Sequence, residues 1–208
     1  MPANAIAGPR NPNAARILED IGLPARASSG AALFLITGLP GTGKSTFARA
    51  LSELTGAVAL ESDRFRGLLF GQPVHSQRES AILFRAIRSA AAKLLSDGQA
   101  VIVDATSVSE ADRWPFYTLA DSVAVPLFIA ALDAPVRVVE ERLGKRLLEA
   151  DGYRFADVAV YHRMRGRVEA ISREHWRVDT SDASAVDAAR TAIAGAYGEV
   201  AGKGEPGK

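Results

Sequence analysis

A glycine-rich stretch, GLPGTGKST at residues 38–46, has the residue types and spacing that bind nucleotide phosphates. It satisfies the pattern G-x-x-x-x-G-K-[ST] between an apolar run and a stretch with helical periodicity, which is the context that the pattern requires. Glycines let the backbone fold around a phosphate with its N–H groups pointing inward, and the N-terminus of the following helix adds positive charge. The sequence therefore predicts a phosphate-binding loop made of Gly38, Leu39, Pro40, Gly41, Thr42, Gly43, Lys44, Ser45 and Thr46.

Two side chains of this loop indicate the ligands that it would hold. Lys44 can reach the β- and γ-phosphates, and the hydroxyl of Ser45 is a hard oxygen ligand for Mg²⁺. We therefore expect ATP and Mg²⁺ at this loop. The chain contains no N-K-x-D string of the kind that reads guanine, and large mechanical ATPases have much longer chains. A small domain with such a loop near its N-terminus favours a kinase.

A carboxylate and a guanidinium follow the second predicted strand, in ESDRFR at residues 61–66. Ligands of a doubly wound sheet lie beyond the carboxyl ends of its strands, so Asp63 and Arg66 should face the γ-phosphate. Asp63 could accept the proton of an attacking hydroxyl, and Arg66 could bind a phosphate or carboxylate of the acceptor or the transferring oxygens. The alternative is a helix-capping aspartate beside a surface arginine. Because the phosphate loop precedes them, we favour the functional roles.

Four segments in this order resemble one family: GLPGTGKSTFARAL, SDRFR, VIVDAT and LDAPVRVVEERLGKR. They are similar to the AAA_33-type P-loop kinases, a group that includes the kinase domain of polynucleotide kinases and is related to gluconate kinases and zeta-toxin-like phosphotransferases. The resemblance extends from about Leu33 to Asp179. It implies that Asp63 is the general base, that Arg66 contacts the acceptor, that Asp104 holds this arginine in place, and that a mobile lid supplies arginine to the phosphates.

Asp104 ends the third predicted strand, VIVD, and keeps two possible roles. An apolar strand that ends in aspartate also fits a carboxylate that holds Mg²⁺ through water, so Asp104 either orients Arg66 or serves the metal. A strand-end capping role is the structural alternative. Arg113, at the start of the next predicted helix, could approach the acceptor or could be a solvated surface residue.

Two arginines follow the fourth predicted strand at a spacing of four residues. This spacing places Arg142 and Arg146 on one face of a helix, where related kinases carry lid arginines. Such groups stabilise charge on the transferring phosphoryl group and close the site against water. The alternative is surface pairing with Glu140, Glu141 or Glu149. We favour the catalytic role, most strongly for Arg146, and expect Lys145 to be solvated.

Residues 151–167, DGYRFADVAVYHRMRGR, mix basic and aromatic side chains. Such a mixture could bind a nucleic-acid strand. An apolar stripe offers the simpler interpretation, which leaves the basic residues on a solvated face. The stripe would contain Val158, Tyr161, Met164 and Val168; the other side chains in question are Tyr153, Arg154, His162, Arg163, Arg165 and Arg167.

Apolar runs and periodicity predict an alternation of strands and helices. Strands are expected at 32–37, 57–61, 100–104, 125–132 and 176–179. Helices are expected at 13–21, 44–54, 80–95, 111–121, 155–171 and 183–197, and one more is expected to begin at a cap, Asp133, and to end at about 148. This alternation implies a mostly parallel sheet with helices on both faces. The predicted fold class is therefore α/β, a three-layer P-loop kinase fold with a predominantly parallel sheet and a helical lid.

Length and composition predict one domain and restrict its partners. The 208 residues are divided into a partly disordered N-terminal extension (1–30), a kinase domain (31–200) and a flexible tail (201–208). The chain has no cysteine, and no apolar run approaches a signal peptide or a membrane span, so we expect a cytoplasmic protein with no membrane partner. The net charge of +1 disfavours a nucleic-acid partner.

The predicted function is transfer of the γ-phosphate of MgATP to a hydroxyl of a small-molecule acceptor. Lys44, Asp63, Arg66, Arg142 and Arg146 would carry the catalysis, and the acceptor would meet Asp63, Arg66, Asp104 and Arg113. Two alternatives remain open: a polynucleotide 5′-hydroxyl kinase, and an ATP-dependent switch or nucleotide-binding module that phosphorylates nothing. The sequence does not define the oligomeric state.

Overall fold

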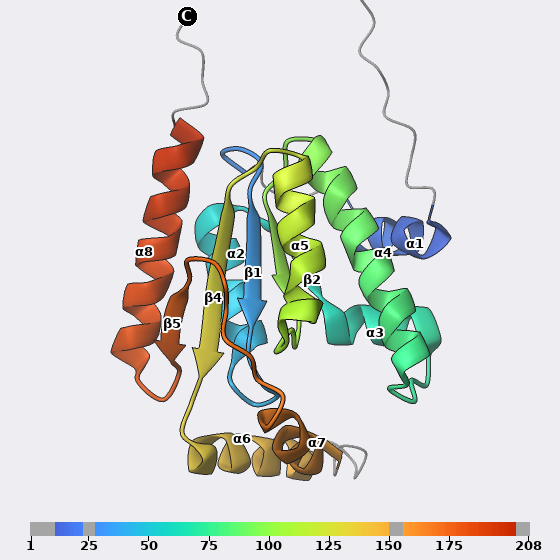
Figure 1. Cartoon of the computed structure of the whole chain (residues 1–208), viewed down its shortest axis with the longest axis vertical. Coiled ribbons are helices and arrows are strands. Elements are labelled where there is room, and N and C mark those ends of the chain that lie inside the picture. Colours follow the sequence, from blue (N-terminus) through green and yellow to red (C-terminus); the bar gives the residue numbers. More distant parts are fainter. Residues whose placement is uncertain (1–10, 23–27, 150–155, 203–208) are drawn as a thin grey trace, which may run out of the picture.

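Five parallel strands form a single sheet at the centre of the protein (Figure 1). The computed structural model describes residues 11–22, 28–149 and 156–202. The strand order is β2-β3-β1-β4-β5, so β1 is central and the chain leaves it first toward one edge and then toward the other. The strands are β1 (Leu33–Thr37), β2 (Val58–Glu61), β3 (Val101–Asp104), β4 (Leu127–Asp133) and β5 (Trp176–Asp179).

Helices cover both faces of the sheet, which confirms the expected three-layer α/β architecture (Figure 1). Helices α2 and α8 pack on one face, and α1, α4 and α5 pack on the other. Their bounds are α1 (Pro12–Ile21), α2 (Lys44–Thr55), α3 (Ser62–Phe70), α4 (Gln77–Ser96), α5 (Glu110–Ser122), α6 (Val136–Glu149), α7 (Ala156–Arg165) and α8 (Ala183–Gly202).

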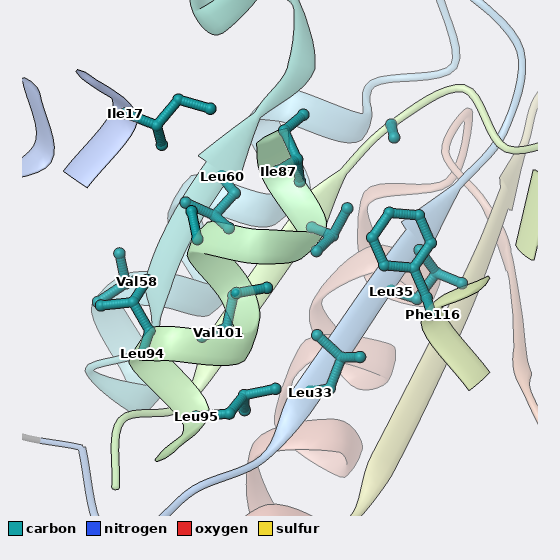
Figure 2. Close-up of a cluster of buried hydrophobic side chains, with 14 of the residues drawn as sticks. Ile17, Leu33, Leu35, Val58, Leu60, Ile87, Leu94, Leu95, Val101 and Phe116 are labelled. Carbon is teal, nitrogen blue, oxygen red and sulfur yellow. The ribbon is translucent and has the colours of Figure 1, made fainter. Parts of the chain in front are cut away.

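The central strand is apolar throughout because both of its faces are buried. Successive side chains of a strand point to opposite faces. Leu33 and Leu35 therefore join the cluster beneath α4 and α5, whereas Phe34 and Ile36 join the cluster beneath α2 and α8. Figure 2 shows the first cluster, in which strand residues Leu33, Leu35, Val58, Leu60 and Val101 lie with helix residues Ile17, Ile87, Leu94, Leu95 and Phe116. This burial on both faces explains why continuous apolar runs located the strands.

Helix α1 packs into the same core as the rest of the domain, although its residues belong to the expected N-terminal extension. Asn11 caps the helix by accepting a hydrogen bond from the N–H of Asn13 at 3.0 Å. Ala14 and Ile17 are fully buried in the cluster that α4 covers. Residues 1–10 and 23–27 of the expected extension and residues 203–208 of the expected tail lie outside the described residues.

Several helices differ from the expectation. Helix α3 was not expected, because its sequence SDRFRGLLF carries only a short apolar pattern. Helix α7 ends at Arg165, well before 171, because Gly166 follows it, and Val168 is 55% exposed instead of joining an apolar stripe. Helix α8 extends to Gly202. Asp133 ends β4, and its side chain accepts a hydrogen bond from the N–H of Ala134. It is not the cap of α6, because that helix begins three residues later, at Val136.

Helices α6 and α7 lie across the edge of the sheet where the strands end (Figure 1). A third apolar cluster holds them there. It joins Leu39, in the loop after β1, to Val139 and Leu143 of α6 and to Tyr161 of α7. The carboxyl ends of the strands are therefore covered by a helical layer of their own. In the part of the chain that the structure describes, no helix is long and apolar enough to cross a membrane.

Candidate functional site

The loop between β1 and α2 is pressed against β4 and α6, and two of its glycines are required for this approach. A Cβ on Gly38 would lie 2.4 Å from the backbone oxygen of Leu132. Gly41 has φ +81°, and a Cβ there would lie 2.8 Å from the side chain of Val139. Other residues would strain or displace the loop at both positions. The curled backbone forms a cradle of the kind that holds phosphates, in agreement with the motif.

Lys44 lies inside this cradle, at the start of α2. Its ammonium donates a hydrogen bond to the backbone oxygen of Leu39 at 2.9 Å. Burial lowers the pKa of Lys44, the charges of Asp104 and Asp63 raise it, and the charge of Arg146 lowers it. Three other expected site residues are therefore close enough to Lys44 to affect its charge. The lysine contacts only a neutral oxygen of the loop, so its charge is available to a phosphate.

Ser45 and Asp104 form the pair that would hold a metal ion. The hydroxyl of Ser45 donates to Oδ2 of Asp104 at 2.5 Å, across the gap between α2 and the end of β3. Burial raises the pKa of Asp104, an effect that the hydrogen bond from Ser45 and the charge of Lys44 partly offset. A hydroxyl and a carboxylate in contact are hard oxygen ligands, so the donor set fits Mg²⁺. Thr46, the last residue of the motif, is exposed.

Asp63 lies in the first turn of α3, directly after β2. Its carboxylate is exposed, and its charge acts on both Lys44 and Asp104. The cap residue of this helix is Glu61, so Asp63 does not have the capping role that was the structural alternative. A solvent-accessible carboxylate beside the phosphate loop is free to meet an incoming acceptor.

Arg66 is buried on α3, but its partners differ from the expected one. Its Nη2 donates to the hydroxyl of Ser80 at 3.3 Å, and its Nη1 lies 3.8 Å from Oε2 of Glu79. Asp104, which the resemblance implied as the partner, is instead hydrogen-bonded to Ser45. Glu79 and Ser80 were missed from the sequence. The spacing Ser76-x-x-Glu79, which is that of a capping box, was the available signal.

The two arginines of α6 are in different environments. Arg142 donates to Oγ1 and to the backbone oxygen of Thr180 at 2.8 and 2.6 Å, and its Nη1 lies 3.5 Å from the backbone oxygen of Gly41. It therefore connects the phosphate loop to the turn after β5. Arg146 is exposed, and its charge reaches Lys44. Sequence reasoning did not find Thr180, which carries no motif.

The surface pairing that was the alternative for these arginines does not form with the described glutamates of α6. Glu140 contacts the ring of His162 on α7 at 2.8 Å, and Glu141 pairs with Arg137. The side chain of Glu149, the third glutamate considered for this pairing, lies outside the part of the chain that the structure describes.

Arg113 is a structural residue, which corrects the expectation that it contacts the acceptor. It is 1% exposed. Its guanidinium pairs with Glu110 at 2.8 Å and donates to the backbone oxygens of Ser107, Val108, Glu169 and Ala170. With these partners, it fastens the start of α5 to the segment after α7 and has no donor left for a ligand.

Helix α7 turns its apolar side toward α6. Tyr161 is buried, and Val158 and Met164 pack against the same cluster. The basic side chains Arg163, Arg165 and Arg167 are exposed. This arrangement agrees with an apolar stripe and a solvated basic face, except at Val168. Tyr153 and Arg154, also considered as nucleic-acid contacts, lie outside the described residues.

Comparisons with known proteins agree with this geometry. The family model AAA_33, described as an AAA domain, matches residues 33–171. The uncharacterized protein Rv2004c of Mycobacterium tuberculosis is 35% identical over 86 residues, which represent 36% of this chain and 17% of that protein. The uncharacterized protein Mb2027c of Mycobacterium bovis matches to the same extent. The chain thus spans only 17% of the length of these curated relatives.

Solved structures with a similar fold include three named kinases. A gluconokinase from Sinorhizobium meliloti 1021 has a TM-score of 0.59 at 20% identity, over 86% of this chain and 100% of its own. A sugar kinase from Janibacter sp. HTCC2649 has a TM-score of 0.60 at 19% identity, over 80% of this chain and 98% of its own. An APS kinase from Mycobacterium tuberculosis, in complex with AMPPNP and APS, has a TM-score of 0.59 at 21% identity, over 79% of this chain and 96% of its own.

At these identities the similarity to the solved structures is one of fold. The family model is the stronger finding, because it covers well over half of the chain and includes the loop at 38–46, Asp63 and Asp104. The chain belongs to the AAA_33 family of AAA domains and has the fold of a P-loop kinase.

Proposed function

We propose that this protein is a kinase that transfers the γ-phosphate of MgATP to a hydroxyl group of a small-molecule acceptor. One observation carries the proposal. The exposed carboxylate of Asp63 lies close enough to Lys44 and Asp104 to affect the pKa of both groups. A phosphate-binding lysine with a spare carboxylate beside it is what a phosphoryl transfer to a hydroxyl requires.

The nucleotide would occupy the cradle after β1. The inward N–H groups of the loop and the N-terminus of α2 bind its phosphates, and Lys44 exchanges its contact with Leu39 for the phosphate oxygens. Arg142 holds the cradle in position by connecting Gly41 to Thr180. Ser45 and Asp104 would hold Mg²⁺, which neutralises phosphate charge when it is bound.

The acceptor would approach from the side of α3. Its hydroxyl oxygen forms a bond to the γ-phosphorus while the bond from that phosphorus to the β–γ bridging oxygen breaks and ADP leaves. Asp63 accepts the hydroxyl proton. The exposed side chain of Arg146 on α6 would stabilise the charge on the transferring group, and α6 with α7 would form the lid that excludes water.

Three features support a small acceptor over a polynucleotide. The net charge is +1, so no strong positive field covers the protein. Tyr161, the aromatic residue of α7 within the described part, is buried and cannot stack on a base. In addition, the solved structures with a similar fold include a gluconokinase, a sugar kinase and an APS kinase.

A phosphorylation screen tests the proposal. The purified protein is incubated with γ-labelled ATP and a pool of metabolites, and in parallel with an oligonucleotide that carries a 5′-hydroxyl. We expect label on a small molecule, no label with Lys44→Ala, and little label with Asp63→Asn. ATP hydrolysis that a macromolecule stimulates, without a phosphorylated product, would contradict the proposal and favour a switch.

A further inference from the structure

Arg66 and Glu79 bring opposite charges together in the buried space between α3 and α4. The side chain of Arg66 is 10% exposed and that of Glu79 is 14% exposed. Their nearest charged atoms, Nη1 and Oε2, are 3.8 Å apart, which is longer than a hydrogen bond. Among the described residues, Nε and Nη1 of Arg66 and Oε2 of Glu79 have no hydrogen-bond partner. Buried polar atoms are rarely left in this state, and the ordinary reasons are a bound water or ion or a role in catalysis.

Other contacts fix the position of Glu79. Its Oε1 accepts a hydrogen bond from the N–H of Val74 at 3.1 Å, and its own N–H donates to the hydroxyl of Ser76, the N-cap of α4. Ser80, the next residue, accepts from Nη2 of Arg66. The first turn of α4 and the segment before it therefore hold the carboxylate of Glu79 near the guanidinium of Arg66. The Nε and Nη1 atoms of Arg66 and Oε2 of Glu79 are left without a hydrogen-bond partner among the described residues.

This pair has consequences for the charge of any acceptor that contacts Arg66. Glu79 already compensates the positive charge of the arginine. An anionic acceptor would bring a second negative charge next to Glu79 in a poorly solvated space, where contact between like charges is strongly unfavourable. A hydroxyl group both donates and accepts hydrogen bonds. It can therefore accept from Nε or Nη1 of Arg66 and donate to Oε2 of Glu79.

We infer that the acceptor is an uncharged polyhydroxyl compound, and that Glu79 is the positioning residue that imposes this selectivity through Arg66. The inference rests on the proposed function, which supplies the acceptor site. It separates this protein from kinases whose acceptors carry a carboxylate or phosphate that an uncompensated arginine would bind. Glu79 does not touch the transferred phosphate. It holds Arg66 and limits the net charge of the subsite to zero.

The variant Glu79→Gln tests the inference, because it keeps an oxygen for Val74 and removes only the charge. Glu110→Gln is the matched control, since Glu110 also pairs with a buried arginine, Arg113, outside the site. Transfer is measured with probe pairs of equal length, D-glucitol with D-gluconate and glycerol with D-glycerate. We expect the wild type and Glu110→Gln to prefer the neutral member in kcat/KM. Glu79→Gln should shift the ratio toward the anionic member by about tenfold or more.

A binding measurement separates this inference from the proposed function. With MgADP saturating the phosphate loop, sulfate is titrated against the wild type, the two single variants and the double variant Arg66→Met/Glu79→Gln. We expect sulfate to bind about tenfold or more tightly to Glu79→Gln than to the other three. If no probe is phosphorylated but this gain appears, the proposed function fails and the charge assignment stands. A wild type that prefers the anionic probes, or a Glu79→Gln variant without the gain, would overturn the inference.

Discussion

At the scale of single residues, the site is defined by the charges around Lys44. The ammonium is buried and contacts only the backbone oxygen of Leu39. The carboxylates of Asp104 and Asp63 favour its charged form, whereas burial and Arg146 disfavour it. A nucleotide phosphate would add negative charge beside the lysine and restore its full affinity for a proton. The site is therefore poised to gain electrostatic stabilisation when a phosphate enters it.

Asp63→Asn tests the carboxylate that is assigned as the general base. The amide keeps the shape of the side chain but cannot take a proton, so kcat should fall by roughly 10²–10⁴ while the affinity for MgATP stays nearly unchanged. Single-turnover kinetics and calorimetry with a non-hydrolysable ATP analogue measure the two quantities. Asp20→Asn serves as the control, because Asp20 pairs with the neighbouring Arg64 on the surface. A change confined to KM would make Asp63 a positioning residue instead.

Asp104→Asn should make the protein more stable and less active. Burial raises the pKa of Asp104, so the folded state holds the proton more tightly than the unfolded state does. The corresponding stabilisation is complete below the unfolded value of 3.8 and is lost as the pH rises through the folded pKa. At neutral pH the charged carboxylate is therefore unfavourable, and Asn should raise Tm by a few degrees.

Thermal unfolding of the wild type and Asp104→Asn over a range of pH checks this expectation. The difference in Tm should be largest near pH 7 and should shrink as the pH falls through the raised pKa, because protonated Asp is then as neutral as Asn. Asp187→Asn, at an exposed position on α8, should show no such gain. A variant whose Tm is lower than that of the wild type at neutral pH would contradict the interpretation.

At the scale of elements, α6 carries two arginines one turn apart that act on different parts of the site. Arg142 is fixed to Thr180 and Gly41, so Arg142→Ala should loosen the phosphate loop and raise the KM for ATP. Arg146 is exposed and its charge reaches Lys44, so Arg146→Ala should lower kcat by roughly 10²–10³ with a smaller effect on ATP affinity. Steady-state kinetics with varied MgATP separate the two.

Arg137→Ala is the control for this pair, because Arg137 lies on the same helix and pairs with Glu141 in solvent. Its kinetic constants should match those of the wild type, since exposed ion pairs contribute little. If Arg146→Ala changed only the KM for ATP, the two arginines would share a nucleotide-binding role, and the catalytic assignment of Arg146 would be lost.

The same elements show what the sequence could and could not predict. Continuous apolar runs located β1 and β3 because both faces of these strands are buried, and the glycine pattern located the phosphate loop because backbone geometry alone demands it. Helix α3 was not predicted because its buried residues, Phe65 and Arg66, are adjacent and give no helical period. The contacts that hold Arg66 and Arg113 across the fold could not be predicted for a different reason. Ser80 lies 14 residues from Arg66 and Ala170 lies 57 residues from Arg113, so no local spacing encodes these two contacts.

At the scale of the whole molecule, the sheet topology brings the site together. The order β2-β3-β1-β4-β5 places the ends of β2, β3 and β1 side by side, so Asp63, Asp104 and the phosphate loop meet at one edge although they are far apart in sequence. Helices α6 and α7 cover that edge (Figure 1). Under the proposed function, the acceptor would approach this edge from the side of α3, where Asp63 is exposed.

The salt dependence of the KM for the acceptor tests whether the acceptor is a small molecule or a polynucleotide. A polynucleotide brings several phosphates, and each phosphate that is neutralised on a single strand adds about 0.7 to the slope of log affinity against log salt concentration. An uncharged acceptor brings none. The net charge of +1 also gives little long-range attraction for a polyanion. We therefore expect the KM of the small acceptor to stay nearly constant between low and moderate salt, with MgATP held at saturation.

The matching measurement is the binding of a single-stranded oligonucleotide with a 5′-hydroxyl over the same range of salt. We expect weak binding and no labelled 5′ end. Replacing Arg163, Arg165 and Arg167 of the α7 region with Gln should leave transfer to the small acceptor unchanged, because these side chains are exposed and lie outside the apolar cluster that joins α7 to α6. Tight binding with a steep salt slope, lost in this triple variant and accompanied by label on the 5′ end, would instead make the basic face of α7 a nucleic-acid site and the protein a polynucleotide kinase.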